Sequence, residues 1–246
     1  MNNQESLIAQ QLDEYNENLY QQMNIPKVRT FEMRDKDYRN HPAISNSDLS
    51  VAKKIIEGKP ITKNTKAFRK GRFIHEAILE PLKWEKTKIF IPTVEKVEVE
   101  EIANIVLNNP VFSELLSRGY WKFEQCVFWE DPVTGISCKA KMDMHLGDLI
   151  IGDLKTTRRE SHEDFLKDAM TFDYDKQVAF YSTPFHAKLF LLIGVSKGKD
   201  TLGELFIEEI PQKSEWMVTG MQKVVELMKA INSDASLLKA VYEARK

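Results

Sequence analysis

The stretch "IIGDLKTTRRE", residues 150–160, combines the features of a buried strand with charged chemistry. Ile150 and Ile151 are typical of a strand that enters a core, yet Asp153 and Lys155 follow at once. Because side chains alternate faces along a strand, these two charged residues project in the same direction. We therefore expect a strand over residues 149–156 whose charged end emerges at a cleft.

Two further strands are predicted before this one, over residues 121–130 and 136–144, and together the three form an antiparallel meander. The turn "HLGD", residues 145–148, brings the last two strands side by side as a hairpin. Asp143 and Asp153 then converge if the register allows. Two carboxylates at close range repel each other unless a cation lies between them, and hard oxygen ligands suit Mg²⁺ or Mn²⁺.

Lys155 is the third candidate in this hairpin. Beside a metal it would supply positive charge where a phosphate transition state gains negative charge, or it would orient or deprotonate the attacking water. A D-x-K sequence after apolar residues also occurs in many unrelated α/β chains. Taken alone, Asp153 and Lys155 are better explained by a solvated ion pair at an exposed strand end.

Composition sets the broad class of the protein. Its 246 residues are 42% hydrophobic and 29% charged, with a formal net charge of -2, which is ordinary for a globular protein. Bulk charge favours no partner, so a nucleic-acid binder of this composition needs a local basic face. The N-terminus lacks a signal-peptide pattern, and no stretch approaches the ~20 apolar residues of a membrane helix, so we expect a cytoplasmic protein.

Two cysteines, Cys126 and Cys138, are present. They exclude a four-cysteine zinc or iron–sulfur site built from this chain alone. A single disulfide remains open, but two free thiols in a reducing cytoplasm are the simpler interpretation.

Hydrophobic periodicity, caps and breakers predict helices on both sides of a central sheet, which makes the fold α/β or α+β. Residues 25–46 are expected to be an irregular arm, and Asn46 or Ser47 is expected to cap the helix that follows. The predicted helices span residues 5–22, 46–58, 65–80, 97–108, 111–119, a segment starting at 161, 174–182 and 213–231. The remaining predicted strands span residues 87–95, 190–197 and 202–210.

Four blocks of the sequence occur in an order known from one nuclease family. They are "HPAISNSDL" at 41–49, "GRFIHEAILEP" at 71–81, "CKAKMDMHLGDLIIGDLKTT" at 138–157 and "QVAFY" at 177–181. With these blocks the chain resembles the RecE/RecB-like branch of the PD-(D/E)XK nucleases, and RecE-type exonuclease VIII domains in particular. The resemblance covers roughly residues 41–210.

The resemblance implies a set of roles. It implies a restriction-endonuclease-like α/β core, in which a mixed sheet with an antiparallel catalytic hairpin is flanked by helices. The implied metal ligands are His75, Asp143, Asp153 and the backbone carbonyl of Leu154, for Mg²⁺ with Mn²⁺ as a substitute. The implied catalytic residues are Lys155, Asp143, Asp153, Gln177 and Tyr181. The family often has a glycine shortly before the first aspartate, whereas this chain has Ala140 and Lys141, and it lacks the cysteines of the iron–sulfur relatives.

Each of these residues also has a simpler explanation. A lone histidine such as His75 in an apolar helix is more often packed than ligating. Gln177 and Tyr181 share one helix face and would also fit a packing and hydrogen-bonding pair. The basic residues near the two blocks are either a solvated face or contacts to a DNA backbone; they are Arg69, Lys70, Arg72, Arg158 and Arg159.

The family further implies an activity and an assembly. We expect a Mg²⁺-dependent exodeoxyribonuclease in a bacterial or phage-infected cell that degrades one strand of linear double-stranded DNA, from 5′ to 3′, and exposes a single strand for an annealing protein. Relatives form homo-oligomeric rings, and an apolar stripe in residues 5–22 is one candidate contact. Residues 1–40 are expected to form an N-terminal helix and arm, and residues 41–246 the nuclease domain.

Two other functions remain open. The same catalytic hairpin serves site-specific and repair endonucleases, because the task depends on loops and oligomer geometry. A nuclease-like domain that only binds DNA or a protein is the second alternative. The presence of both aspartates and the lysine argues against the latter.

Overall fold

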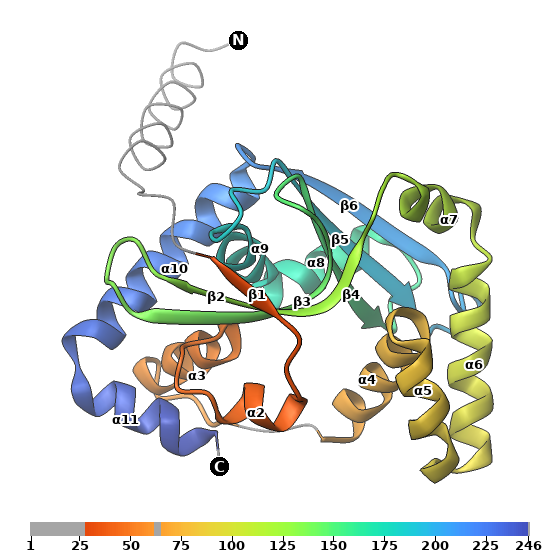
Figure 1. The fold of residues 1–246 in the computed structure, drawn as a ribbon, viewed down its shortest axis with the longest axis horizontal. Coiled ribbons are helices and arrows are strands. Elements are labelled where there is room, and N and C mark those ends of the chain that lie inside the picture. The colour runs from red at the N-terminus through yellow and green to blue at the C-terminus, as the bar shows by residue number, and fades with distance from the viewer. Residues whose placement is uncertain (1–27, 62–64, 246) are drawn as a thin grey trace.

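A six-stranded sheet in the order β1-β2-β3-β4-β5-β6 forms the centre of the computed structural model, which describes residues 28–61 and 65–245. All neighbouring strands are antiparallel except β4 and β5, so the sheet is mixed as predicted (Figure 1). The strands are β1 (Arg29–Phe31), β2 (Lys122–Glu130), β3 (Ser137–Leu146), β4 (Ile150–Thr157), β5 (Leu189–Ser196) and β6 (Leu205–Pro211).

Helices cover both faces of this sheet. One face packs against α4 (Thr65–Leu79), α5 (Pro81–Thr87), α6 (Thr93–Leu107) and α7 (Pro110–Ser117). The other packs against α3 (Asn46–Ile56), α8 (His162–Thr171), α9 (Tyr174–Ser182), α10 (Glu215–Ser233) and α11 (Ala235–Ala244). We call the apolar core beneath α4–α7 the first core, and that beneath α3 and α8–α11 the second core. The remaining helices are α2 (Asp35–Asn40) and the 3₁₀ turn η1 (Lys88–Phe90).

Local signals explain where several helices begin and end. Ser45 caps α3, and it forms a capping box with Asp48, so the predicted caps Asn46 and Ser47 were one and two residues late. Gly58 follows the end of α3 with a positive φ of 64°, a conformation that glycine adopts without strain. Ser161 caps α8 as predicted.

Two predictions about elements were wrong, and one helix was missed. Residues 87–95 form the end of α5, η1 and the start of α6 instead of a strand. No strand among the described residues pairs with them, and most of their apolar side chains are exposed, with Phe90 85% exposed. Part of the predicted arm is the edge strand β1 and the helix α2, and α11 was not foreseen. The predicted helix 5–22 lies outside the described residues.

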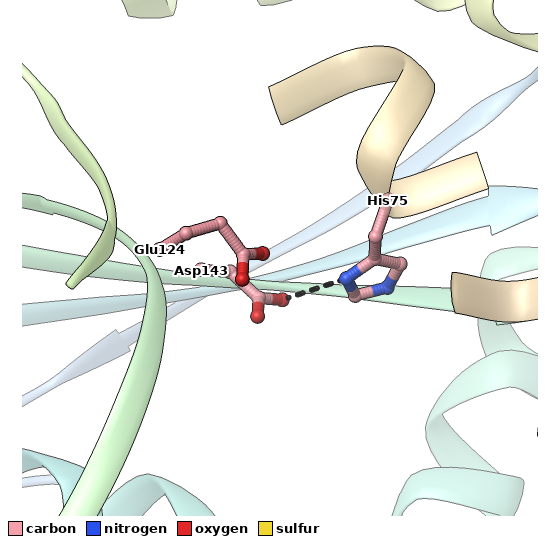
Figure 2. Close-up of side chains that lie close together, drawn as sticks. All are labelled: His75, Glu124 and Asp143. Atoms are coloured by element: carbon pink, nitrogen blue, oxygen red, sulfur yellow. Dashed lines mark ion pairs between the residues drawn. The ribbon is translucent and has the colours of Figure 1, made fainter. Parts of the chain in front are cut away.

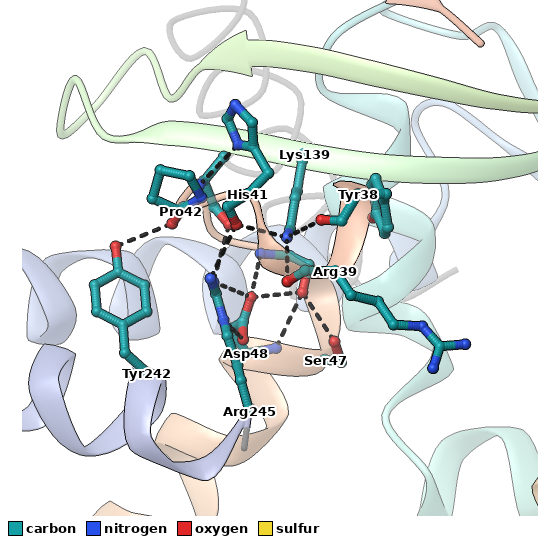
Figure 3. A network of polar contacts seen from close by, with 11 residues as sticks. Tyr38, Arg39, His41, Pro42, Ser47, Asp48, Lys139, Tyr242 and Arg245 are labelled. Atoms are coloured by element: carbon teal, nitrogen blue, oxygen red, sulfur yellow. Dashed lines mark hydrogen bonds and ion pairs between the residues drawn. The ribbon is translucent and has the colours of Figure 1, made fainter. Parts of the chain in front are cut away.

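The segment 41–48, the first of the four blocks, is tied to the C-terminal helix (Figure 3). Arg245, next to the last turn of α11, donates to both carboxylate oxygens of Asp48 at 2.8 Å. It also donates to the carbonyl oxygens of His41 and Ala43 at 3.0 and 2.9 Å. This block therefore joins chain segments that lie far apart in the sequence.

A buried lysine of β3 completes the same network. The ammonium of Lys139 donates to the carbonyl oxygens of Tyr38 and His41 at 2.7 and 2.8 Å. Burial, and then the charge of Arg245, lower the pKa of Lys139 to about 8.

None of the helices in residues 28–61 and 65–245 combines the length and apolar character needed to span a lipid bilayer.

Candidate active site

Three carboxylates form a row across β2, β3 and β4. Phe123 pairs with Met144 and Gln125 with Met142, so Glu124 lies opposite Asp143. The β3–β4 ladder ends at Met144 and Gly152, and one step further along the two strands Asp143 lies opposite Asp153. The hairpin register therefore brings the two predicted aspartates together.

Beyond Met144 and Gly152, β3 and β4 are no longer paired through their backbones. A hydrogen bond to a side chain joins them there instead. The backbone N–H of Leu154 donates to Oδ2 of Asp143 at 2.7 Å. This bond fixes the Asp143 carboxylate at the mouth of the hairpin. The carbonyl ligand role of Leu154 stays a prediction.

The sheet also exchanges its packing faces at this row. Residues two apart on a strand normally lie on one face, yet Met144 packs in the first core and Met142 in the second. In β2 the same exchange separates Phe123 from Val127. Glu124 lies between them with a φ of 52°, a left-handed conformation that is rare for a residue with a side chain. Such strain is concentrated at functional sites in proteins.

His75 reaches this row from α4 (Figure 2). Its Nδ1 lies 3.4 Å from Oδ2 of Asp143, and ligand atoms of His75, Glu124 and Asp143 all lie within 4.8 Å of one another. Gly71, one helical turn earlier, permits the approach, because a Cβ there would lie 3.2 Å from the Thr156 hydroxyl. The glycine and the histidine of the predicted motif thus act together.

The electrostatics of this group favour a bound cation. Burial raises the pKa of Asp143 to about 7, with the charge of Asp153 as the next cause. Burial also raises the pKa of Glu124 to about 7, followed by the charge of Asp143. Burial lowers the pKa of His75, which keeps its imidazole neutral and able to ligate. Two hard oxygens and one neutral nitrogen fit a divalent metal.

A chain of alternating charges holds Glu124 in place. The ammonium of Lys141 lies 2.6 Å from Oε2 of Glu124 and 3.0 Å from Oδ1 of Asp35. Asp35 in turn lies 3.3 Å from the ammonium of Lys83 on α5. Lys141 is therefore the residue that positions Glu124.

Asp153 faces a different set of partners. Its carboxylate pairs with Lys155 and accepts a hydrogen bond from Nε2 of Gln177 on α9 at 2.7 Å. Burial alone would lower the pKa of Lys155, but the carboxylates of Asp153 and Asp143 outweigh it, so the pKa is raised. Asp153 therefore lies outside the group of His75, Glu124 and Asp143, and its role as a ligand stays a prediction.

The start of α9 covers Lys155. The ammonium lies 5.2 Å from the ring centroid of Tyr174, within cation–π range. Asp173, just before it, has a φ of 54° and is held by Lys53 at 2.5 Å and Lys223 at 2.9 Å. These two ion pairs stabilise a strained residue and thereby fix the helix that carries Tyr174.

Tyr181 lies one turn beyond Gln177 on the same helix. Burial raises its pKa, and the charges of Asp153 and Asp143 add to this effect. Its phenol is therefore protonated near the carboxylates. Its contact to DNA stays a prediction.

Most of the predicted DNA-contacting residues are already paired with acidic side chains. Only Arg158 lacks an ion pair within the part of the chain that the structure describes. The pairs join Arg69 to Glu95 at 2.7 Å, Lys70 to Glu98 at 2.5 Å, Arg72 to Glu76 at 3.5 Å and Arg159 to Asp168 at 2.8 Å.

Sequence reasoning missed Glu124, Lys141 as its partner, and Tyr174. Glu124 was detectable in principle, because the turn between β2 and β3 sets a register that places it opposite Asp143. The Glu124 carboxylate lies within ligand distance of His75 and Asp143 because the backbone of Glu124 is left-handed, and no local sequence pattern predicts that conformation. Tyr174 is three residues before Gln177, and so on a neighbouring part of the same helix surface.

A family model described as "PDDEXK-like domain of unknown function (DUF3799)" matches residues 47–235 of this chain. The chain belongs to this family. The match includes His75, Glu124 and both aspartates, and it confirms the predicted membership of the PD-(D/E)XK superfamily. A comparison with curated proteins gives no match.

Among solved structures, the PDDEXK-like chain is similar to a protein from Eubacterium rectale named "Putative exonuclease". The TM-score is 0.58 at 16% sequence identity, and the alignment covers 87% of this chain and 88% of that one. At this identity the likeness shows the fold alone. It confirms the predicted α/β class with a mixed sheet and flanking helices.

Proposed function

We propose that this chain is a divalent-metal-dependent deoxyribonuclease that degrades one strand of linear double-stranded DNA, from 5′ to 3′, and exposes a single strand for an annealing protein. The convergence of His75, Glu124 and Asp143 beside Lys155 carries this proposal. Membership of the PDDEXK-like family supports a nuclease. The name of the Eubacterium rectale protein is in line with an exonuclease.

Mg²⁺ fits the proposed site, because two buried carboxylates with raised pKa values lack a full complement of positive charge. His75, Glu124 and Asp143 would hold the ion, with Asp153 and the Leu154 carbonyl as further ligands. A bound ion supplies Lewis-acid polarisation of the scissile phosphate and a more acidic water. Lys141 offsets part of the charge on Glu124 until the ion arrives.

The remaining residues act on charge and water. Lys155 is protonated, so it stabilises negative charge on the phosphate or orients the attacking water. Gln177 holds the Asp153 carboxylate that pairs with Lys155, and Tyr174 shields the ammonium from solvent. A dry surrounding strengthens this electrostatic effect.

Activity and end requirement are tested in one assay. Wild type, Asp153→Ala and Lys155→Ala are incubated with 5′- and 3′-labelled linear duplex and with supercoiled plasmid, in Mg²⁺ and in EDTA. We expect wild type to release the 5′ label first, to spare the plasmid and to require Mg²⁺. Asp148→Ala, an exposed acid in the turn of the same hairpin, is the matched control with wild-type activity.

Other results would point to the alternatives. Nicking or linearisation of the plasmid would indicate an endonuclease on the same fold. Intact substrates under all conditions would favour a domain that only binds DNA or protein. A homo-oligomeric ring is part of the proposal, and light scattering after size-exclusion chromatography gives its subunit number.

A further inference from the structure

A second group of charged residues lies at the carboxyl ends of β4 and β5. These strands are parallel and pair as far as Thr157 and Ser196. Lys197 follows at once, and its backbone N–H donates to the carbonyl of Thr157 at 2.7 Å. Its ammonium donates to the hydroxyl of Thr156 at 3.0 Å. Ligands of open α/β sheets bind beyond the carboxyl ends of parallel strands.

The loop that carries Lys197 is fixed by its own hydrogen bonds. The Ser196 hydroxyl donates to the backbone carbonyl of Arg159 at 3.0 Å. The same hydroxyl lies 2.7 Å from the hydroxyl of Thr201. The backbone N–H of Gly198 donates to the Ser196 hydroxyl at 3.0 Å. Lys197 is therefore presented from a defined position beside β4.

Lys197 is not paired with an acidic side chain in the described part of the chain. No carboxylate among residues 28–61 and 65–245 lies within ion-pairing distance of its ammonium, although the side chain is half-buried. Burial lowers the pKa of Lys197, and the charges of Lys70 and Arg158 add to the effect. Positive charges near a half-buried ammonium raise its free energy, and a bound anion relieves that cost.

This cationic group adjoins the candidate metal site through α4. Thr156, the hydrogen-bond partner of Lys197, also touches Gly71, where a Cβ would lie 3.2 Å from its hydroxyl. His75 lies four residues further along α4, about 6 Å away along the axis, and its ring lies 3.4 Å from Asp143. Suppose that a DNA strand places one phosphate over the carboxylates. The neighbouring phosphate of that DNA strand would then lie toward Lys197.

We propose that Lys197, together with Arg158 and Lys70, binds the DNA-backbone phosphate next to the scissile one. This inference rests on the proposed nuclease function and names the group that positions its substrate. Lys197 and Arg158 carry most of the contact, because Lys70 shares its charge with Glu98. Arg69 and Arg159 are neutralised by their own acidic partners and contribute little.

The test compares Lys197→Met with Lys199→Met, an exposed lysine two residues away on the same loop. Binding of fluorescent duplex DNA is measured by anisotropy in EDTA over a range of salt concentrations, and cleavage is measured in Mg²⁺. We expect Lys197→Met to weaken binding about tenfold at low salt and to reduce the slope of log Kd against log salt by about 0.9. KM should rise with little change in kcat, Lys197→Arg should restore the slope, and Lys199→Met should behave like wild type.

Folding is checked by thermal denaturation, and methionine keeps the aliphatic stem of the lysine, so the Tm should not fall. A folded Lys197→Met with the wild-type slope and KM would overturn the inference while the nuclease function stands. A variant with normal binding but reduced kcat would overturn it too, since Lys197 would then act in the chemistry. A wild-type protein that neither binds nor cuts duplex DNA would overturn both proposals.

Discussion

Glu124 and Asp143 lie opposite each other across β2 and β3, at the point where both strands exchange their packing faces. The exchange places the two carboxylates between the two cores, where both are largely buried. Burial raises the pKa of each carboxylate to about 7. The fold therefore places side by side two groups whose ionised form is disfavoured. A divalent cation between them would relieve this repulsion, and His75 offers a neutral nitrogen within ligand distance of both.

The variant Glu124→Gln tests whether Glu124 binds a divalent cation. Without metal, the variant is expected to have a higher Tm than wild type near pH 8, because a buried like charge is gone. With Mn²⁺ or Mg²⁺ its gain in Tm should be smaller than that of wild type, and cleavage should fall about 10–100-fold. Glu130→Gln, an exposed acid at the end of the same strand, is the control. Differential scanning fluorimetry measures the Tm of wild type and both variants with and without metal. Equal metal-induced increases in Tm in all three proteins would contradict the assignment of Glu124 as a ligand.

Gly71 should be sensitive to the size of its replacement. Alanine there meets only the Thr156 hydroxyl at 3.2 Å, which can rotate aside, so Gly71→Ala should keep activity and the fold. Valine adds branches that push α4 away from β4 and move His75 from Asp143. Misplacement by about 1 Å costs roughly 100-fold in rate, so Gly71→Val should be folded but nearly inactive. Cleavage rate and circular dichroism are measured in parallel, and an active Gly71→Val would contradict this account of the motif.

Gly220 is required by the close approach of α10 to α9. A Cβ at this position would lie 2.0 Å from the backbone carbonyl oxygen of Asp175, which cannot rotate away. Gly220→Ala should therefore lower the free energy of unfolding by about 3 kcal/mol. Urea titration followed by circular dichroism measures the effect. The neighbouring half-buried Thr219→Ala should change it by less than about 1 kcal/mol, and equal effects at both sites would refute the steric explanation.

Lys139 should make stability depend on pH. Its pKa is about 8 in the folded protein and 10.5 when unperturbed, so between these values the unfolded chain binds more protons. Stability should thus be lower below pH 8 and rise as pH increases from about 8 toward 10. Lys176, also lowered to about 8 by burial, contributes in the same direction.

The variant Lys139→Met separates the two lysines. It loses the bonds to the carbonyls of Tyr38 and His41, so it should be less stable at every pH, but its rise between pH 8 and 10 should be smaller than that of wild type. Urea midpoints at several pH values give the two slopes. An unchanged slope would show that the Lys139 ammonium is not the titrating group.

The β3–β4 hairpin was predictable from the sequence because its determinants are local. Alternation fixes the faces of β4, and Gly147 with a φ of 57° closes the turn that joins it to β3. With the turn fixed, the register of Asp143 and Asp153 follows. The capped start of α8 at Ser161 is local in the same sense.

Other parts depend on contacts that no local pattern contains. Residues 87–95 contain a short apolar run, as a strand can, but whether an apolar side chain is covered by a partner is decided by the rest of the fold, and Ile89 and Phe90 remain exposed. Glu124 becomes part of the site through a left-handed residue and an exchange of faces along two strands. The pairing of predicted basic residues with α6 likewise depends on how two distant helices pack.

The exchange of faces also limits how the gene for such a chain can change. Adding or deleting one codon within β2 or β3 would shift every apolar side chain beyond it onto the wrong core and carry Glu124 or Asp143 out of line. We therefore expect members of this family to differ in the lengths of their loops while the spacing from the "DPVTG" turn to the acidic pair stays constant.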